Sequence, residues 1–174
     1  MKRHDLPASG APRKRRTAGH AQEDHVIDTY MLRKKLSDPT RCPRCGAVYH
    51  EGRWQWAQGL LPPKHHEELC PACHRIDDKY PAGVVTIMDP ALPGRKSEII
   101  ALARNLEDAE KADHPLNRIM AIEEQTEAEL VITTTDIHLP RRIGEAVQRA
   151  FHGDLKVHYD EGNYFVRVEW RREA

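Results

Sequence analysis

Long hydrophobic runs are missing from this sequence, which argues against a membrane-spanning helix, since a span needs roughly 18 consecutive apolar residues. The N-terminal residues also lack the apolar core of a secretory signal. Aromatic residues are few, at 6% of the 174 residues. The length fits one medium domain, or a small domain with an appendage, around a modest core. We therefore expect a soluble, cytoplasmic protein with no membrane partner.

Net charge is lacking too, because 27 Lys and Arg residues balance 27 Asp and Glu residues. The balance hides a segregation of charge along the chain. Residues 1–20 contain six basic residues against Asp5 alone, whereas residues 89–129 contain ten acidic and five basic residues. Overall neutrality therefore does not exclude a polyanionic partner.

Large apolar side chains are almost absent from the first 23 residues, which are interrupted by Pro7, Gly10 and Pro12. Such a segment cannot bury enough surface to offset the entropy of ordering, so we expect a disordered basic arm over residues 1–23. Cations that displace counterions from phosphates add salt-dependent affinity. The candidate nucleic-acid-binding residues of the arm are Arg13, Lys14, Arg15 and Arg16. A solubilising tail explains the same run equally well.

Residues 24–36 predict a helix. Asp24 is a suitable N-cap, apolar residues recur at helical spacing over residues 26–31, and the last turn is basic. Pro39 disfavours continuation of the helix. Residues 37–41 then act as a linker to a cysteine-bearing module over residues 42–80.

All four cysteines occur in two copies of the pattern Cys-Pro-x-Cys. The first copy contains Cys42 and Cys45, and the second contains Cys70 and Cys73. Two residues between paired thiolates let both sulfurs point inward from one tight turn, and two such knuckles supply the four thiolates of a tetrahedral zinc site. The spacing predicts Zn²⁺ in a ribbon or treble-clef-like knuckle pair, with a hairpin over residues 46–56.

Other uses of these cysteines fit less well. Cytosolic thiols stay reduced, which argues against disulfides, and a redox Cys-x-x-Cys motif normally occurs once. Four thiolates also close the coordination shell and leave no position for a catalytic water. His65, His66 or His74 can replace a cysteine as ligand, although four thiolates already suffice.

Residues 81–174 alternate between strand and helix patterns. We expect a strand over 82–88, a helix from Ser97 to about residue 113, and a hairpin of strands over 118–124 and 129–135. A second helix, capped by Thr135 or Asp136, ends at Gly153, and a second hairpin closes the chain. The predicted fold class is α+β: a two-layer, ferredoxin-like βαββαββ domain that follows the zinc knuckle pair.

Four arginines outside the arm are further candidates for nucleic-acid contact. They are Arg44 and Arg53 on the zinc module, and Arg141 and Arg142 at the start of the last helix. Lys64 and Arg75 add to a mildly basic surface of the module. Cations near a helix N-terminus oppose its dipole, so the pair on the helix indicates either an anionic partner or simple solvent exposure.

Recognised catalytic motifs are absent: the sequence has no complete phosphate-binding loop, no nucleophile elbow and no metalloprotease helix. Asp136 and His138 follow three threonines at a strand end, where an acid and a base could act together. Helix capping explains the same residues more simply.

Two Cys-Pro-x-Cys knuckles precede an α+β domain that contains Ile-Thr-Thr-Thr-Asp-Ile-His-Leu at 132–139 and Arg-Arg-Ile-Gly at 141–144. In these features, over roughly residues 42–172, the chain resembles a small bacterial relative of the large-ribosomal-subunit export adaptor family of archaea and eukaryotes. That family is named for its third nonsense-mediated-decay gene, and its members carry further cysteine pairs and domains. The resemblance implies zinc binding and docking on ribosomal RNA or protein.

Three functional hypotheses follow. The leading one is a non-enzymatic zinc-binding protein that contacts RNA, foremost on the ribosome, through its arm and zinc module. The alternative is a protein-binding adaptor, or a transcriptional or stress regulator, that uses the zinc module and a sheet edge. The third is an enzyme with its site at Asp136 and His138.

Overall fold

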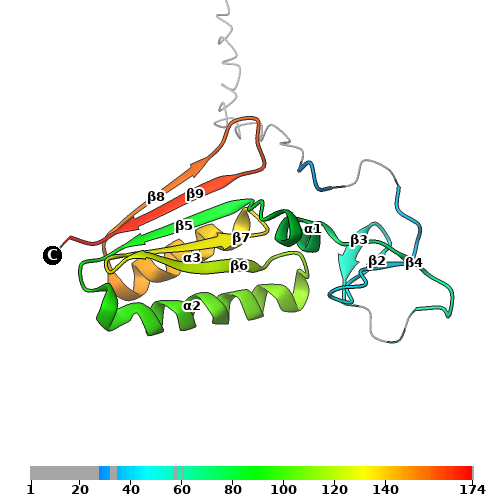
Figure 1. Ribbon diagram of the computed structural model, residues 1–174, viewed down its shortest axis with the longest axis horizontal. Helices are drawn as coiled ribbons and strands as arrows, with labels where there is room; N and C mark the ends of the chain where they lie inside the picture. Colours follow the sequence, from blue (N-terminus) through cyan, green and yellow to red (C-terminus); the bar gives the residue numbers. More distant parts are fainter. Residues whose placement is uncertain (1–27, 32–34, 57–58, 60, 174) are drawn as a thin grey trace, which may run out of the picture.

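The computed structural model describes residues 28–31, 35–56, 59 and 61–173. The predicted arm over 1–23, with Arg13, Lys14, Arg15 and Arg16, lies outside the described residues. The described part contains a small sheet, a larger sheet and three helices, which confirms the α+β class (Figure 1). No helix among these residues is both long and apolar enough to cross a membrane.

The small sheet and the first helix make up the cysteine-bearing module. Its strands lie in the order β3-β2-β1-β4, and helix α1 follows the last of them in sequence. The bounds are β1 Thr40–Arg41, β2 Val48–His50, β3 Arg53–Gln55, β4 His66–Glu67 and α1 Pro71–Asp78. The predicted hairpin is formed by β2 and β3, which pair antiparallel around a turn at Glu51 and Gly52, both with positive φ.

The larger domain follows the predicted order of strand, helix, two strands, helix and two strands. The elements are β5 Gly83–Met88, α2 Leu92–Asp113, β6 Ile119–Thr126, β7 Glu129–Thr134, α3 His138–Phe151, β8 Asp154–Tyr159 and β9 Val166–Arg171. Both expected hairpins are present, as β6 with β7 and β8 with β9.

The order of strands in the larger sheet is β6-β7-β5-β9-β8. In a plain ferredoxin-like sheet, the strand after the second helix would lie beside β5. Here β9 takes that place, parallel to β5, and moves β8 to the edge. The reason is hydrophobicity: every second residue of β9 is buried, whereas β8 is exposed along most of its length.

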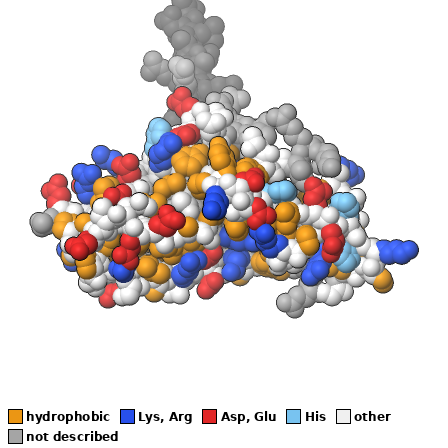
Figure 2. Space-filling model, viewed as in Figure 1, with side chains coloured by type: hydrophobic (Ala, Val, Ile, Leu, Met, Phe, Trp, Pro, Cys, Tyr) orange, Lys and Arg blue, Asp and Glu red, His pale blue; other side chains and the backbone are white. Residues whose placement is uncertain are grey.

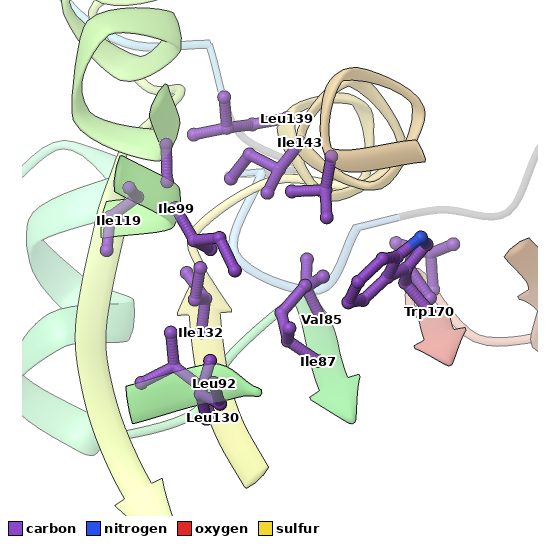
Figure 3. Packing of buried hydrophobic residues seen from close by; sticks show 14 residues of the cluster. Val85, Ile87, Leu92, Ile99, Ile119, Leu130, Ile132, Leu139, Ile143 and Trp170 are labelled. Carbon is purple, nitrogen blue, oxygen red and sulfur yellow. The ribbon is translucent and has the colours of Figure 1, made fainter. Parts of the chain in front are cut away.

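One face of the larger sheet packs against α2 and α3. Figure 3 shows Val85 and Ile87 of β5 beside side chains from both helices, with Trp170 of β9 closing one side of the cluster. Trp170 is fully buried, and its indole Nε1 donates to the carbonyl of His152 at 2.7 Å. The helix-facing side of the sheet is thus the main core.

Helix α2 begins at Leu92, earlier than the expected start at Ser97, so the prediction of Ser97 as N-cap is wrong. Pro93 lies in the first turn of the helix, where its missing amide donor costs nothing. Just before the helix, buried Asp89 accepts a hydrogen bond from the Ala91 amide at 2.9 Å. The residues between β5 and Ser97 thus already contain the start of the helix.

The predicted helix over 24–36 is wrong at its described residues, because 28–31 form a turn and 35–36 have no regular structure. Residues 24–27 and 32–34 lie outside the described part. The Asp28 carboxylate accepts the amide of Tyr30 at 2.9 Å and pairs with the Arg75 guanidinium. These side-chain contacts compete with helical hydrogen bonding.

Candidate metal centre

The first cysteine pair lies in a tight turn between β1 and β2. The Cys42 amide donates to the Ala47 carbonyl at 2.8 Å, and the Gly46 amide donates to the Cys42 carbonyl at 2.9 Å. Gly46 has a φ of 80°, a left-handed conformation that glycine adopts without steric cost. The turn brings the sulfurs of Cys42 and Cys45 close to each other.

The second pair lies in the first turn of α1, a helix that the sequence analysis did not predict. Cys70 is the N-cap, and its Sγ accepts the Cys73 amide at 3.4 Å. Pro71 follows at the first helical position, which favours a helix start. That Cys-Pro step was the available signal for the helix.

The fold brings the four predicted cysteines together. Their Sγ atoms all lie within 4.8 Å of one another, and this cluster contains no histidine from the described residues. Cys45 Sγ and Cys70 Sγ are 3.7 Å apart. That separation is too long for a disulfide, which needs about 2.05 Å, and it matches the edge of about 3.8 Å of a tetrahedron with metal–sulfur bonds of 2.3 Å. The arrangement fits one tetrahedral metal ion.

The thiols of the cluster perturb one another. A hydrogen bond from Cys70 lowers the pKa of the Cys45 thiol to about 4. The same hydrogen bond, together with burial, raises the pKa of Cys70, and burial raises the pKa of Cys73 to about 11. Without a cation, the cluster therefore favours a thiolate at Cys45 beside protonated Cys70 and Cys73. Binding of a divalent ion would release the protons of the other thiols and balance the charge of the thiolates that form.

Arg118, just before β6, approaches the sulfurs from the larger domain. Its Nη1 donates to Cys73 Sγ at 3.4 Å, and its Nη2 lies 3.8 Å from Cys70 Sγ. Its Nε donates to the Pro115 carbonyl at 2.6 Å, which fixes the plane of the guanidinium. The sequence analysis missed this residue, because 45 positions separate it from Cys73 and no local pattern marks the contact.

A small apolar cluster surrounds the centre. Trp54 is 9% exposed and meets the Tyr49 ring edge to face, with centroids 5.8 Å apart. Leu116, from the loop before β6, packs against the same cluster. The buried members of the cluster are Leu36, Cys42, Ala47, Trp54, Cys70, Ala72 and Cys73. The sulfurs of the pairs are thus shielded from water on several sides.

The four described arginines that were predicted to contact nucleic acid are exposed, and three of them have acidic partners. Arg44 pairs with Asp77, Arg141 with Glu145 at 2.7 Å, and Arg142 with Glu110. Arg53 is exposed and makes no ion pair with another described residue. Figure 2 shows basic and acidic side chains intermingled over the face in view.

Arg75 is not part of a basic surface, contrary to the sequence analysis. It is 1% exposed, and its guanidinium lies over the Tyr30 ring at 4.3 Å from the centroid. Its Nη1 donates to the Tyr80 carbonyl at 3.2 Å, and it pairs with Asp28. It attaches the 28–31 turn to α1.

His138 is the first residue of α3, and the N-cap position is Ile137, one residue after the predicted Asp136. The Asp136 carboxylate nevertheless reaches the first helical amides. Oδ2 of Asp136 accepts the amides of His138 at 2.7 Å and of Leu139 at 2.9 Å. Burial raises the pKa of this carboxyl. The His138 contact is made by the backbone and not by the imidazole, so the pair has the geometry of a helix cap.

The fold and the site together define a two-layer α+β domain that carries a module whose four cysteines could hold a metal ion. No protein-family model matches the chain, and comparisons with curated proteins and with solved structures found no match either. The functional argument therefore starts from the centre itself.

Proposed function

We propose that the protein is a non-enzymatic zinc-binding protein that contacts RNA on the ribosome. The observation that carries the proposal is the closed set of four cysteine sulfurs within 4.8 Å of one another. A metal ion held by four thiolates has no open position for substrate or water, so its role is to hold the fold.

Zinc is the ion that this ligand set favours. A tetrahedral site of four sulfurs selects zinc or iron, and zinc is the usual structural choice. One cysteine pair follows a short strand and precedes a hairpin, and the other opens a helix. That layout is treble-clef-like, which supports a structural metal.

Contact with RNA is supported by charge and by the resemblance to the ribosomal export adaptor family. The basic run of the arm supplies the charge, and exposed Arg53 adds a cation on the zinc module. Surface ion pairs contribute little to stability, so Arg44 and Arg141 can exchange their carboxylates for phosphate at small cost. We expect binding that weakens steeply as salt rises.

Metal content tests the first half of the proposal. Protein purified without chelator should contain about one zinc ion per chain, and Cys42→Ser or Cys70→Ser variants should lose it. Elemental analysis gives the result directly. A coloured, iron-containing protein would overturn the assignment to zinc, and metal-free protein would overturn the site.

Sedimentation with ribosomes and with purified ribosomal RNA tests the second half. We expect co-migration at low salt, lost when Arg13, Lys14, Arg15 and Arg16 are changed to Gln. A matched control removes four exposed charges from the body of the protein, at Lys79, Arg149, Lys156 and Arg171. An arm variant that behaves like the unmodified protein, or a control variant with the same loss, would contradict arm-directed binding.

A protein-binding adaptor is the second candidate, favoured by the edge strand β8. This strand pairs only with β9 among the described residues, and it leaves Val157 36% and Tyr159 44% exposed. An open edge can accept a strand from another protein. Partners that stay bound in a pull-down after nuclease treatment would favour this function over RNA contact.

A further inference from the structure

A cleft of about 690 Å³ lies beside the metal-binding module. Its walls come from the first turn of α1, the end of α2, the loop before β6 and the turn between β7 and α3. The volume is that of a site for a small ligand or a single large side chain. The cleft contains none of the four cysteines, so it is distinct from the metal centre.

Three carboxylates line this cleft, and two of them already have cationic partners. Asp28 pairs with buried Arg75, and Glu110 pairs with Arg142. The third, Asp136, is 3% exposed, and its Oδ2 is occupied by the backbone amides at the start of α3. Its Oδ1 is buried and has no hydrogen-bond partner within the described part of the chain.

A buried carboxylate oxygen without a donor costs free energy. Burial also raises the pKa of Asp136, in keeping with an oxygen that lacks a donor. The missing partner is therefore a hydrogen-bond donor, and a positively charged donor would compensate the ionised carboxylate best.

The remainder of the lining mixes apolar side chains with polar ones, among them His114, Asn117 and His138. Met31, Pro71 and Leu116 offer aliphatic surface, and Tyr164 adds an aromatic ring. A ligand that fits both parts has a hydrocarbon stem and a cationic head. Side chains of this kind bury the stem along apolar surface while the head finds a polar partner.

We propose that the cleft binds a guanidinium or ammonium group on an aliphatic stem, with the cationic head donating to Oδ1 of Asp136. Arginine and lysine side chains have this chemistry, whether in a peptide or as free amino acids. The proposal does not depend on RNA contact, because the group that receives the cation is Asp136. Of the basic residues assigned to RNA contact, Arg142 lines the cleft, where it pairs with Glu110.

The first test compares charged and neutral probes on the full-length, zinc-loaded protein. We expect N-acetylarginine amide or N-acetyllysine amide to bind, and N-acetylcitrulline amide, the neutral isostere of the first, to bind at least tenfold more weakly. Isothermal titration gives the affinities. Equal binding of the arginine and citrulline probes, or no binding of either cation at millimolar concentration, would overturn the proposal.

The second test locates the site. Asp136→Asn keeps an oxygen for the α3 cap but removes the charge and places a donor toward the ligand, so the affinity for the cationic probe should fall at least tenfold. Asp113→Asn is the matched control, an exposed residue outside the cleft, and should leave the affinity unchanged. Amide shifts in NMR spectra should map to residues 114–117 and 135–138. Shifts elsewhere, or equal effects of both variants, would refute the site.

Should Asp136→Asn not fold, the probe comparison and the shift map on the unmodified protein still decide the question. Free L-arginine, compared with N-acetylarginine amide, distinguishes the two sources of the ligand. Tighter binding of the acetylated amide assigns the cleft to a peptide side chain. Tighter binding of the free amino acid assigns it to a small-molecule ligand.

Discussion

Arg118 is the residue through which the larger domain reaches the metal centre. Four thiolates around a divalent ion leave a net negative charge in a partly buried place, and a guanidinium at 3.4 Å from Cys73 Sγ offsets part of it. The backbone amide of Arg118 donates to Thr135 Oγ1 at 3.0 Å, so a contact within the larger domain fixes the position of Arg118. Arg118 therefore connects the larger domain directly to the sulfurs of the candidate metal site.

We expect Arg118→Ala to weaken zinc binding by about 10- to 100-fold, the range typical for removal of a group that hydrogen-bonds metal ligands. Arg118→Lys should have a zinc affinity between those of the unmodified protein and of Arg118→Ala, because an ammonium keeps the charge but cannot contact both sulfurs and the Pro115 carbonyl together. Competition with a chromophoric chelator gives the affinities. Arg104→Ala, which removes an exposed arginine of α2, is the control. An affinity for Arg118→Ala equal to the control would show that the contact has no role.

The packing of α3 on the sheet depends on a close approach at Gly144. A Cβ added there would lie 2.5 Å from Val168 Cγ1 and 2.8 Å from Leu155 Cδ1, closer than non-bonded carbon atoms normally approach. Val168 is 1% exposed and belongs to the main core. The contact lies over β8 and β9, so it also holds the second hairpin against the helix.

Gly144→Ala should therefore lower the free energy of unfolding by about 1–3 kcal/mol, the usual cost of overpacking a core. Gly94→Ala provides a matched comparison, because Gly94 is also helical but has no atom within 4 Å of the added Cβ. That change should raise the free energy of unfolding by about 0.4–1 kcal/mol, because alanine reduces the conformational entropy of the unfolded chain. Denaturant titration of both variants measures the difference. Equal stabilities would contradict the close packing of α3.

Two separate hydrophobic clusters organise the part of the molecule that the structure describes. The larger lies between the five-stranded sheet and helices α2 and α3, and the smaller surrounds the four cysteines. The smaller cluster includes three of the cysteines as buried members, so its order depends on how their sulfurs are held together. The larger cluster contains no cysteine.

Removal of the metal should therefore unfold residues 40–78 and leave the larger domain folded, since a structural metal supplies folding free energy only where its ligands lie. Hydrogen exchange read by mass spectrometry tests this. After chelation, peptides from β1 to α1 should lose protection, while β5, β7 and β9 should keep it. Loss of protection throughout the chain would show that the two clusters fold as one unit.

Local pattern determined much of this protein. Two Cys-Pro-x-Cys knuckles identified the four candidate metal ligands that the fold brings together, because chemistry and spacing alone restrict what such pairs can do. Local strand patterns placed the strands of the larger domain, and the sequence also placed the small hairpin within residues 46–56. The same local reasoning failed where side chains from distant parts of the chain compete with the pattern, as at the Asp28 turn, which is held by Arg75.

Tertiary structure alone decided the rest. The insertion of β9 beside β5 and the approach of Arg118 to the sulfurs join residues that are far apart in sequence. The burial of Oδ1 of Asp136 without a hydrogen-bond partner among the described residues likewise depends on what packs around it. Strand partners, buried charges and clefts depend on which surfaces meet after folding. The sequence specified the ligands and the elements because these follow from neighbouring residues. It did not specify the arrangement around the centre, because long-range packing sets that arrangement.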